Sequence, residues 1–482
     1  MSVIRNTGHN LIAALVPTVV ALVTLPLMIA AVGEARYGVI ALVTALVGYF
    51  GVFDFGLSAA TAQRIAAAGH DDLASRRAIF WTAAGVNLGM GLLAAILVAP
   101  AALWFFDQAH LLDPALMAEI RQSLPFIALA LPVMLLGGVL RGALQGAGEF
   151  AALNRIAVVT GPLGQILPLL VAMYLSPRLP AVLAMLYAVR LVSLGWQAAI
   201  VARRVTQGWT PHFERGRVKD LLSFGGWVTV SALVDPLLTT IDRFLIGARL
   251  GMHVVSWYTV PQQLAQRSLI VPGALVEAML PRVASGSEAE ALAVSRRGLR
   301  AIVAIMTPPF LAGIAFVHPF LALWISPEFA ANSALPAQFM LLGCWLNGLG
   351  YGCFQHLRAR GRPRLIAIAH LIEIPPYLAV LLFAMSHFGL AGAAAAFAFR
   401  VLFDDLLLAG LGGLGRELVR LLALALPLLG LALWLGQRVQ ALPDLLTIPA
   451  LVAVLLVLVA GCASLLWLWG ERTTLRNAFG KA

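Results

Sequence analysis

The sequence has 482 residues, of which 61% are hydrophobic and only 11% are charged, and its formal net charge is +11. A soluble domain carries about 25% charged residues, so this composition excludes a soluble globular protein and indicates one that lies in a lipid bilayer. The positive charge does not indicate a nucleic-acid partner, because the basic residues are placed according to the predicted membrane segments.

Apolar runs long enough to cross a hydrocarbon core, about 20 residues each, recur along the whole chain. The first run, Leu11 to Ala31, contains no charge and is too long for the core of a cleavable signal peptide. We therefore predict an all-α polytopic membrane protein with about 14 transmembrane helices. The predicted spans cover residues 11–31, 37–61, 78–104, 122–146, 156–175, 181–202, 221–249, 253–280, 301–325, 334–357, 365–386, 388–411, 421–437 and 445–469.

The basic residues are divided unevenly between the two ends of these spans. If the N-terminus is cytoplasmic, most of the 33 lysines and arginines fall in inner loops or at inner span ends. This is the positive-inside pattern, which is most reliable for short loops. It predicts an even number of spans and places both termini in the cytoplasm.

The longest interior polar stretch, residues 203–220, follows the sixth predicted span and precedes six more. The turn Gly33–Gly38 resembles residues 251–258, which follow the first span of the second half. This weak repeat predicts two pseudo-symmetric six-helix bundles, an arrangement typical of transporters. The predicted domains are an N-terminal bundle (1–202), a cytoplasmic basic linker (203–220), a C-terminal bundle (221–411), and an accessory helix pair with a cytoplasmic tail (412–482).

Ionisable residues inside spans are costly, so they usually face a cavity or a partner. Arg267 lies near the middle of the eighth predicted span, and Gln263 lies one turn before it on the same face. A guanidinium beside amides suits a phosphorylated sugar head group, and a structural ion pair is the alternative. The predicted substrate-binding residues are Arg267, Gln263, Gln266 and Gln262.

The seventh predicted span carries Asp235 at about the depth of Arg267, directly before the helix-bending Pro236. Asp235 either binds a coupling proton or sodium ion or pairs permanently with Arg267. We interpret Asp242 and Arg243, near the outer interface, as a gate or an inter-helix pair. Asp54 and Arg64 lie toward the inner end of the second span, where we expect an inner gate. The predicted coupling or gating residues are Asp235, Asp242, Arg243, Asp54 and Arg64.

A last group of charges lies on the eleventh and twelfth predicted spans. Arg400 and Asp404 are spaced i, i+4 and can pair, with Asp405 and Glu373 at a similar depth. We predict a structural ion cluster of these four residues. The three cysteines lie in predicted spans and indicate no metal site, and P-loop, HExxH and GxSxG motifs are absent from the sequence.

Two groups of residues resemble the signatures of one family of membrane proteins. The first includes Asn6, Thr7, Asn10, Pro26, Leu27, Gly33, Tyr37, Gly38, residues 53–58 and Arg64, and the second includes residues 241–247, Leu250, Gly251 and Tyr258. In them the chain resembles bacterial Wzx-type flippases for lipid-linked oligosaccharides. These form the polysaccharide-transporter branch of the MOP superfamily, which also contains lipid II flippases and MATE exporters.

The resemblance implies two bundles around a central cavity that work by alternating access. Its implied substrate is an undecaprenyl-diphosphate-linked oligosaccharide, such as an O-antigen repeat unit, moved from the inner to the outer leaflet of the bacterial cytoplasmic membrane. We expect a monomeric transporter and not an enzyme, without a resident cofactor and with a proton or sodium ion for coupling. Expected partners are membrane lipids, the polysaccharide polymerase and the chain-length machinery, with no nucleic acid.

Other functions stay open on the sequence. A MATE-like exporter of small organic molecules would carry uncompensated carboxylates in its cavity, in place of an arginine with glutamines. A lipid II flippase resembles this chain, but its first span would carry core arginines that are missing here. A membrane-embedded glycosyltransferase or ligase would need clustered acids or histidines in a larger loop. A scaffold without transport activity is a further alternative.

Overall fold

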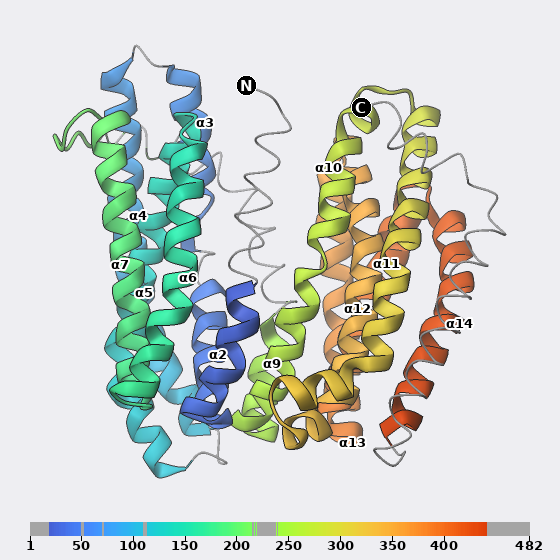
Figure 1. The fold of residues 1–482 in the computed structure, drawn as a ribbon. Coiled ribbons are helices and arrows are strands. Elements are labelled where there is room, and N and C mark those ends of the chain that lie inside the picture. The colour runs from blue at the N-terminus through green and yellow to red at the C-terminus, as the bar shows by residue number, and fades with distance from the viewer. Residues whose placement is uncertain are drawn as a thin grey trace. The chain divides into compact units, whose positions relative to one another are not determined.

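The computed structural model describes residues 19–49, 53–69, 72–108, 113–214, 216, 218, 238 and 240–440. All regular secondary structure in these residues is helical (Figure 1), which confirms the predicted all-α class. The chain divides into two compact units, Met1–Ser256 and Trp257–Ala482. The predicted domain limits, with a linker at 203–220, stay a prediction.

The first described helix of the first unit is Val19–Val32, and residues 240–250 of this unit are also helical. Its other described helices are α2 (Glu34–Tyr49), α3 (Leu57–Ala68), α4 (Leu73–Gln108), α5 (Pro114–Gly146), α6 (Phe150–Tyr174) and α7 (Leu179–Arg204). In the second unit, the helices after Trp257 are the rest of α9 (Met252–Arg267), then α10 (Ile270–Ser285), α11 (Glu288–Trp324), α12 (Pro327–Ala359), α13 (Pro363–Leu411) and α14 (Gly415–Gln440).

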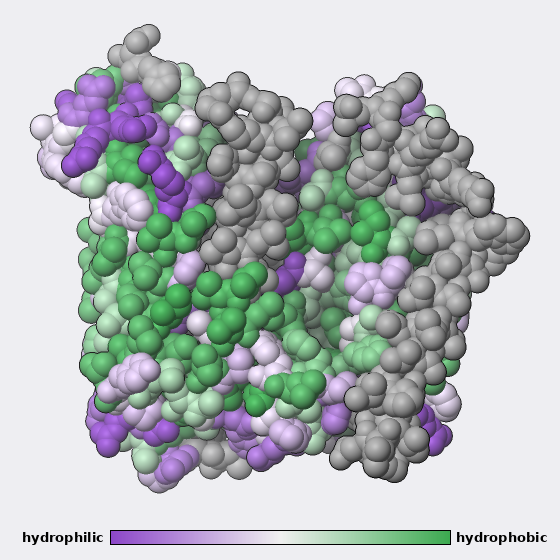
Figure 2. All heavy atoms as spheres, in the orientation of Figure 1, coloured by the Kyte–Doolittle hydropathy of each residue, from purple (hydrophilic) through white to green (hydrophobic). Residues whose placement is uncertain are grey.

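Eight described helices are long and apolar enough to cross a membrane, and the bent segment Met252–Ser285 would make a ninth. Figure 2 shows hydrophobic residues across the middle of the first unit's visible face and hydrophilic residues at both ends. This pattern matches a helical bundle surrounded by lipid. The predicted total of 14 spans stays a prediction, and the last predicted span, 445–469, lies outside the described residues.

A row of glycines lets two helices of the first unit approach closely. Gly138, Gly142 and Gly146 repeat every four residues along α5 and face α3. A Cβ atom on Gly142 would collide with the backbone of Ser58, and one on Gly146 with the backbone of Ala62. Small residues at this spacing are a common way for membrane helices to pack backbone against backbone.

The predicted second span, 37–61, is wrong as a single helix, because α2 ends at Tyr49 and α3 begins at Leu57. Phe55 and Gly56 have φ values of 45° and 70°, and consecutive left-handed residues cannot continue a right-handed helix. The Asp54 carboxylate then accepts a bond from the Ser58 N–H at 3.1 Å, which stabilises the start of α3. The break therefore places a half-buried carboxylate at a helix N-terminus.

The predicted eighth span, 253–280, is also interrupted, because α9 ends at Arg267 and α10 begins at Ile270. Pro272 has no N–H to donate to the Ser268 carbonyl. That carbonyl instead accepts a bond from the Val271 N–H at 3.2 Å, which closes a 3₁₀-type turn three residues apart. Arg267 thus stands at a helix interruption, a finding that the apolar run alone did not predict.

α13 is a helical hairpin and not one straight span. At about 1.5 Å per residue its 49 residues would be far longer than a hydrocarbon core of about 30 Å. The chain turns at Gly389, where φ is 56° and ψ is −134°, and a Cβ on Gly392 would meet the backbone of Ala384. The two halves match the predicted spans 365–386 and 388–411.

The described start of the predicted linker, residues 203–214, lies along α4. Arg77 donates to the backbone carbonyl oxygens of Thr206 at 2.6 Å and Gln207 at 2.8 Å. The Glu214 N–H donates to the Thr82 hydroxyl at 3.1 Å. This segment is therefore packed against the first unit.

Candidate functional site

The predicted substrate-binding residues all lie on α9. Gln262 is fully buried, Gln263 and Gln266 are partly exposed, and Arg267 is exposed at the end of the helix. Gln263 and Arg267 remain one helical turn apart, as the sequence predicts, because α9 is continuous between them. The structure thus offers an exposed guanidinium with two amides on the preceding turn.

Asp54 accepts hydrogen bonds from donors on two helices of the first unit, and one of these donors also bonds to a third helix. Its carboxylate accepts bonds from the Ser58 hydroxyl at 2.7 Å and from the Asn87 side-chain amide of α4 at 2.6 Å. Asn87 also donates to the Leu135 carbonyl of α5 at 3.3 Å. Asp54 therefore joins α3, α4 and α5, which fits a positioning role as well as the predicted gate. Arg64 lies near the end of α3, partly exposed.

The predicted outer pair lies in the helical segment 240–250. Asp242 is buried, and its carboxylate accepts a bond from the Arg243 backbone N–H at 2.8 Å. Phe244 packs edge-on against Phe105 of α4, with ring centroids 5.3 Å apart. This segment is anchored in the first unit. Asp235, the predicted coupling residue, lies outside the described residues.

An ion pair between α2 and α5, with a further hydrogen bond from α7, holds helices of the first unit together. Arg36 of α2 donates two bonds to Glu119 of α5, at 2.9 and 2.8 Å, and the Leu179 N–H of α7 donates a third at 3.0 Å. The bond to Glu119 raises the pKa of Arg36 still further above its ordinary value, so the arginine stays charged. The sequence analysis missed this pair, whose members are far apart in the chain.

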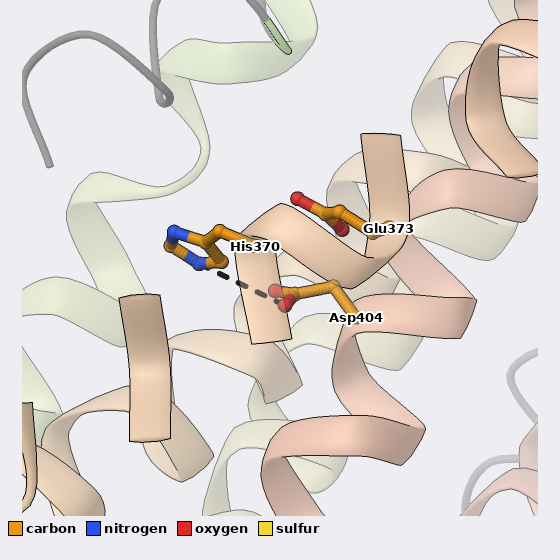
Figure 3. Close-up of side chains that lie close together, drawn as sticks. All are labelled: His370, Glu373 and Asp404. Carbon is orange, nitrogen blue, oxygen red and sulfur yellow. Dashed lines mark ion pairs between the residues drawn. The ribbon is translucent and has the colours of Figure 1, made fainter. Parts of the chain in front are cut away.

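The charges of the α13 hairpin come together in the interior of the second unit (Figure 3). Arg400 lies 3.5 Å from Glu373, and His370 lies 3.7 Å from Asp404, measured between nitrogen and oxygen. His370, Glu373 and Asp404 can each turn one ligand atom to within 4.8 Å of the others. The Arg400 guanidinium also lies over the rings of Tyr377 and Phe397, at 5.8 and 5.7 Å.

The carboxylates of this cluster outnumber its fixed positive charge. Asp405 and Glu373 are 0% and 1% exposed, and within the described part of the chain both Asp405 oxygens have no hydrogen-bond partner. Gly350 of α12 packs directly against the Asp405 carboxylate. A buried carboxylate without donors is unfavourable unless it binds a proton or a cation. The structure therefore brings these residues together, and Arg400 alone does not balance their charge.

His370 is the member that the sequence analysis did not place in the cluster. The pairs His370–Asp404 and Glu373–Arg400 are both centred close to residue 387, next to the turn at Gly389. A hairpin centred there brings these positions together because its two arms run antiparallel. The turn at a single glycine inside a long apolar run was the signal that could have found His370.

These features define a class of protein: a polytopic helical membrane protein built from two units, with ionisable groups held inside its spans. The fold is similar to that of MOP-superfamily transporters. It matches the lipid II flippase MurJ in an inward closed conformation with a TM-score of 0.70 and 12% identity, over 93% of this chain and 97% of that chain. It matches a multidrug resistance MATE family transporter in an inward-facing conformation with a TM-score of 0.61 and 14% identity, over 84% and 95%.

The sequence comparisons identify the family. The model of the polysaccharide biosynthesis protein family matches residues 3–286, and the chain belongs to this family. The chain is also 27% identical, over 412 residues, to a Shigella flexneri protein named "Putative O-antigen transporter". That alignment covers 85% of this chain and 97% of the relative. The resemblance inferred from the sequence motifs is thereby confirmed.

Proposed function

We propose that this protein is a flippase that moves a lipid-linked oligosaccharide, such as an O-antigen repeat unit on undecaprenyl diphosphate, across the membrane. The observation that carries the proposal is the nearly full-length similarity to an O-antigen transporter, within a family of polysaccharide biosynthesis proteins. The likeness to transporters supports a function without covalent catalysis. Movement from the inner to the outer leaflet of the bacterial cytoplasmic membrane, with both termini cytoplasmic, belongs to the same proposal.

Arg267 is the proposed head-group contact in the second unit. It is exposed, it ends α9, and it follows Gln263 and Gln266 by one turn or less. A guanidinium presents a planar fork of donors that matches two phosphate oxygens, and amides can bind sugar hydroxyls. Because α9 stops at this residue, the head group would meet Arg267 at an interruption of the α-helix.

We assign the coupling cation, a proton or a sodium ion, to the acidic cluster of α13. The support is the excess of carboxylates over Arg400 and the buried Asp405 without donors. Protonation, or a bound sodium ion, would neutralise that excess, and its release would leave a charge that favours another conformation. Asp235 stays a second proposed site for this ion. We also propose that the protein is a monomer and works beside the polysaccharide polymerase and the chain-length machinery.

The test is flux of a lipid-linked oligosaccharide in proteoliposomes, with and without an imposed proton or sodium gradient. We expect flux by the wild type and its loss in Arg267→Ala, with partial recovery in Arg267→Lys, since an ammonium lacks the planar fork. Arg282→Ala is the matched control, because Arg282 is an exposed arginine on the next helix. Equal flux in Arg267→Ala and Arg282→Ala would remove Arg267 from the site, and no flux by the wild type would refute the function.

A further inference from the structure

One arginine inside a span of the first unit has no part in the site described above. Arg190 is in the middle of α7, nine residues from the outer end and twelve from the inner end of the predicted span 181–202. At about 1.5 Å per residue these distances are about 14 and 18 Å, more than an arginine side chain can reach. Arg190 therefore cannot place its charge at either interface.

Nothing in the described part of the chain neutralises this charge. The Arg190 guanidinium makes no hydrogen bond, ion pair or aromatic ring contact with these residues, although it is partly removed from solvent. Two other arginines of this unit, Arg36 and Arg204, each have a carboxylate within 3 Å. An unpaired guanidinium at mid-membrane depth is costly, and such residues usually mark the path of a substrate or an ion.

Arg190 lines a small, partly open cavity between α2, α5 and α7, with a volume of about 20 Å³. Each of these helices contributes one face, and two more polar side chains are present, Tyr187 one turn before Arg190 and Thr44. The remaining walls are apolar and are formed by Val43, Val47, Phe126, Ile127, Ala130, Leu183 and Leu186. The cavity thus offers one positive charge and one phenolic hydroxyl inside a hydrocarbon wall.

We propose that this cavity binds the phosphate group of an isoprenoid lipid, with Arg190 and Tyr187 on the phosphate oxygens and the apolar wall beside the adjoining hydrocarbon chain. A guanidinium is the preferred partner of phosphate, and a hydroxyl can donate a further bond. A soluble anion would have no use for the apolar walls, and a neutral lipid would leave the arginine unpaired. The inference rests on the proposed function for the identity of the lipid, and it adds a phosphate site in the first unit.

Binding to the full-length protein in nanodiscs tests the site. The probes are undecaprenyl phosphate, undecaprenol, which has the same chain without the phosphate, and inorganic diphosphate. For Arg190→Met we expect undecaprenyl phosphate to bind about 10- to 100-fold more weakly, the usual effect of losing a charged hydrogen bond. Arg190→Lys and Tyr187→Phe should show smaller losses. Arg203→Met, which removes one charge from the exposed end of the same helix, is the matched control and should bind normally.

Undecaprenol should bind equally to all variants. The site is refuted if Arg190→Met binds undecaprenyl phosphate as the wild type does, or if undecaprenol loses affinity to the same extent. Equally tight binding of inorganic diphosphate would refute a lipid ligand. If Arg190→Met does not accumulate in the membrane, full affinity in both Arg190→Lys and Tyr187→Phe refutes the site instead.

Flux separates this inference from the proposed function. Binding that depends on Arg190 in a protein without flux would support the site and refute the flippase. Normal flux, together with undecaprenyl phosphate binding that does not depend on Arg190, would refute the site and support the flippase.

Discussion

In the first unit the buried Glu119 and the half-buried Asp54 each accept bonds from several donors, whereas in the second unit one cluster holds three carboxylates and one guanidinium. Glu119 receives three hydrogen bonds, two of them from Arg36, and Asp54 receives bonds from Ser58 and Asn87. In the second unit Arg400 contacts Glu373, while the buried oxygens of Asp405 receive no bond from the described residues. Arg190 of the first unit instead has no carboxylate partner among the described residues.

The difference indicates which charges hold the fold and which can respond to a ligand. A carboxylate that already has its full set of donors gains little from a cation, so Glu119 and Asp54 serve the architecture. Asp405 and Arg190 have unmet requirements of opposite sign, one for a cation and one for an anion. Asp405 in the second unit and Arg190 in the first are thus groups that a ligand could satisfy.

The largest expected effect comes from removing the only guanidinium of the acidic cluster. Arg400→Met should destabilise the protein by about 3–5 kcal/mol, because it leaves buried carboxylates without a fixed counter-charge. The double variant Glu373→Gln/Arg400→Met should recover part of this loss. Unfolding in detergent measures it, with Arg438→Met as a control at the exposed end of α14, where the loss should stay below about 1 kcal/mol. A tolerated Arg400→Met would mean that the cluster is uncharged.

An intermediate effect is expected at the ion pair of the first unit. Glu119→Gln should cost about 1.5–3 kcal/mol, because the charge-assisted bonds from Arg36 weaken while the arginine stays charged. The matched control is Asp107→Asn, which breaks the exposed pair with Arg121 and should cost about 1 kcal/mol or less. The comparison of melting temperatures decides the point. Equal costs for the two variants would show that Glu119 does not fasten the unit.

The smallest effect on stability is expected at Asp405. Asp405→Asn keeps the shape and removes a buried charge without donors, so the free energy of unfolding should change by about 1 kcal/mol or less, in either direction. The response of the melting temperature to sodium ions and to pH should change more. The melting temperature of the wild type should rise with added sodium ions or at lower pH, and that of Asp405→Asn should respond to neither. A variant that responds as the wild type does would exclude Asp405 from the cation site.

The long helices were predictable because their apolar runs exceed what any soluble element needs. The predicted spans for α4 to α7, α11, α12 and α14 lie inside the observed helices or pass one end by a single residue, while the helices themselves are longer. The break before α3 was not predictable, since residues 37–61 are apolar enough for one span and the left-handed Phe55 and Gly56 interrupt them. Local pattern determines where a helix can form, and backbone conformation at a few residues determines where it stops.

The candidate sites divide in the same way. The residues on α9 and α13 were found because a charge inside an apolar run is visible in the sequence alone. Their partners were not, because Glu119 is 83 residues from Arg36 and His370 is brought to Asp404 only by the turn at Gly389. Which side chain completes a pair depends on tertiary packing.

The hairpin of α13 also bears on how the protein enters the membrane. Taken separately, its arms would each carry ionised residues into hydrocarbon, at about 2.5–3.5 kcal/mol per charge on insertion scales. Held together, they place Arg400 beside Glu373 and His370 beside Asp404 without a contribution from another helix to either pair. We therefore expect the two arms of α13 to leave the translocon together. The short turn at Gly389 then matters as much for biogenesis as for the finished structure, because a long insertion there would make each arm partition alone.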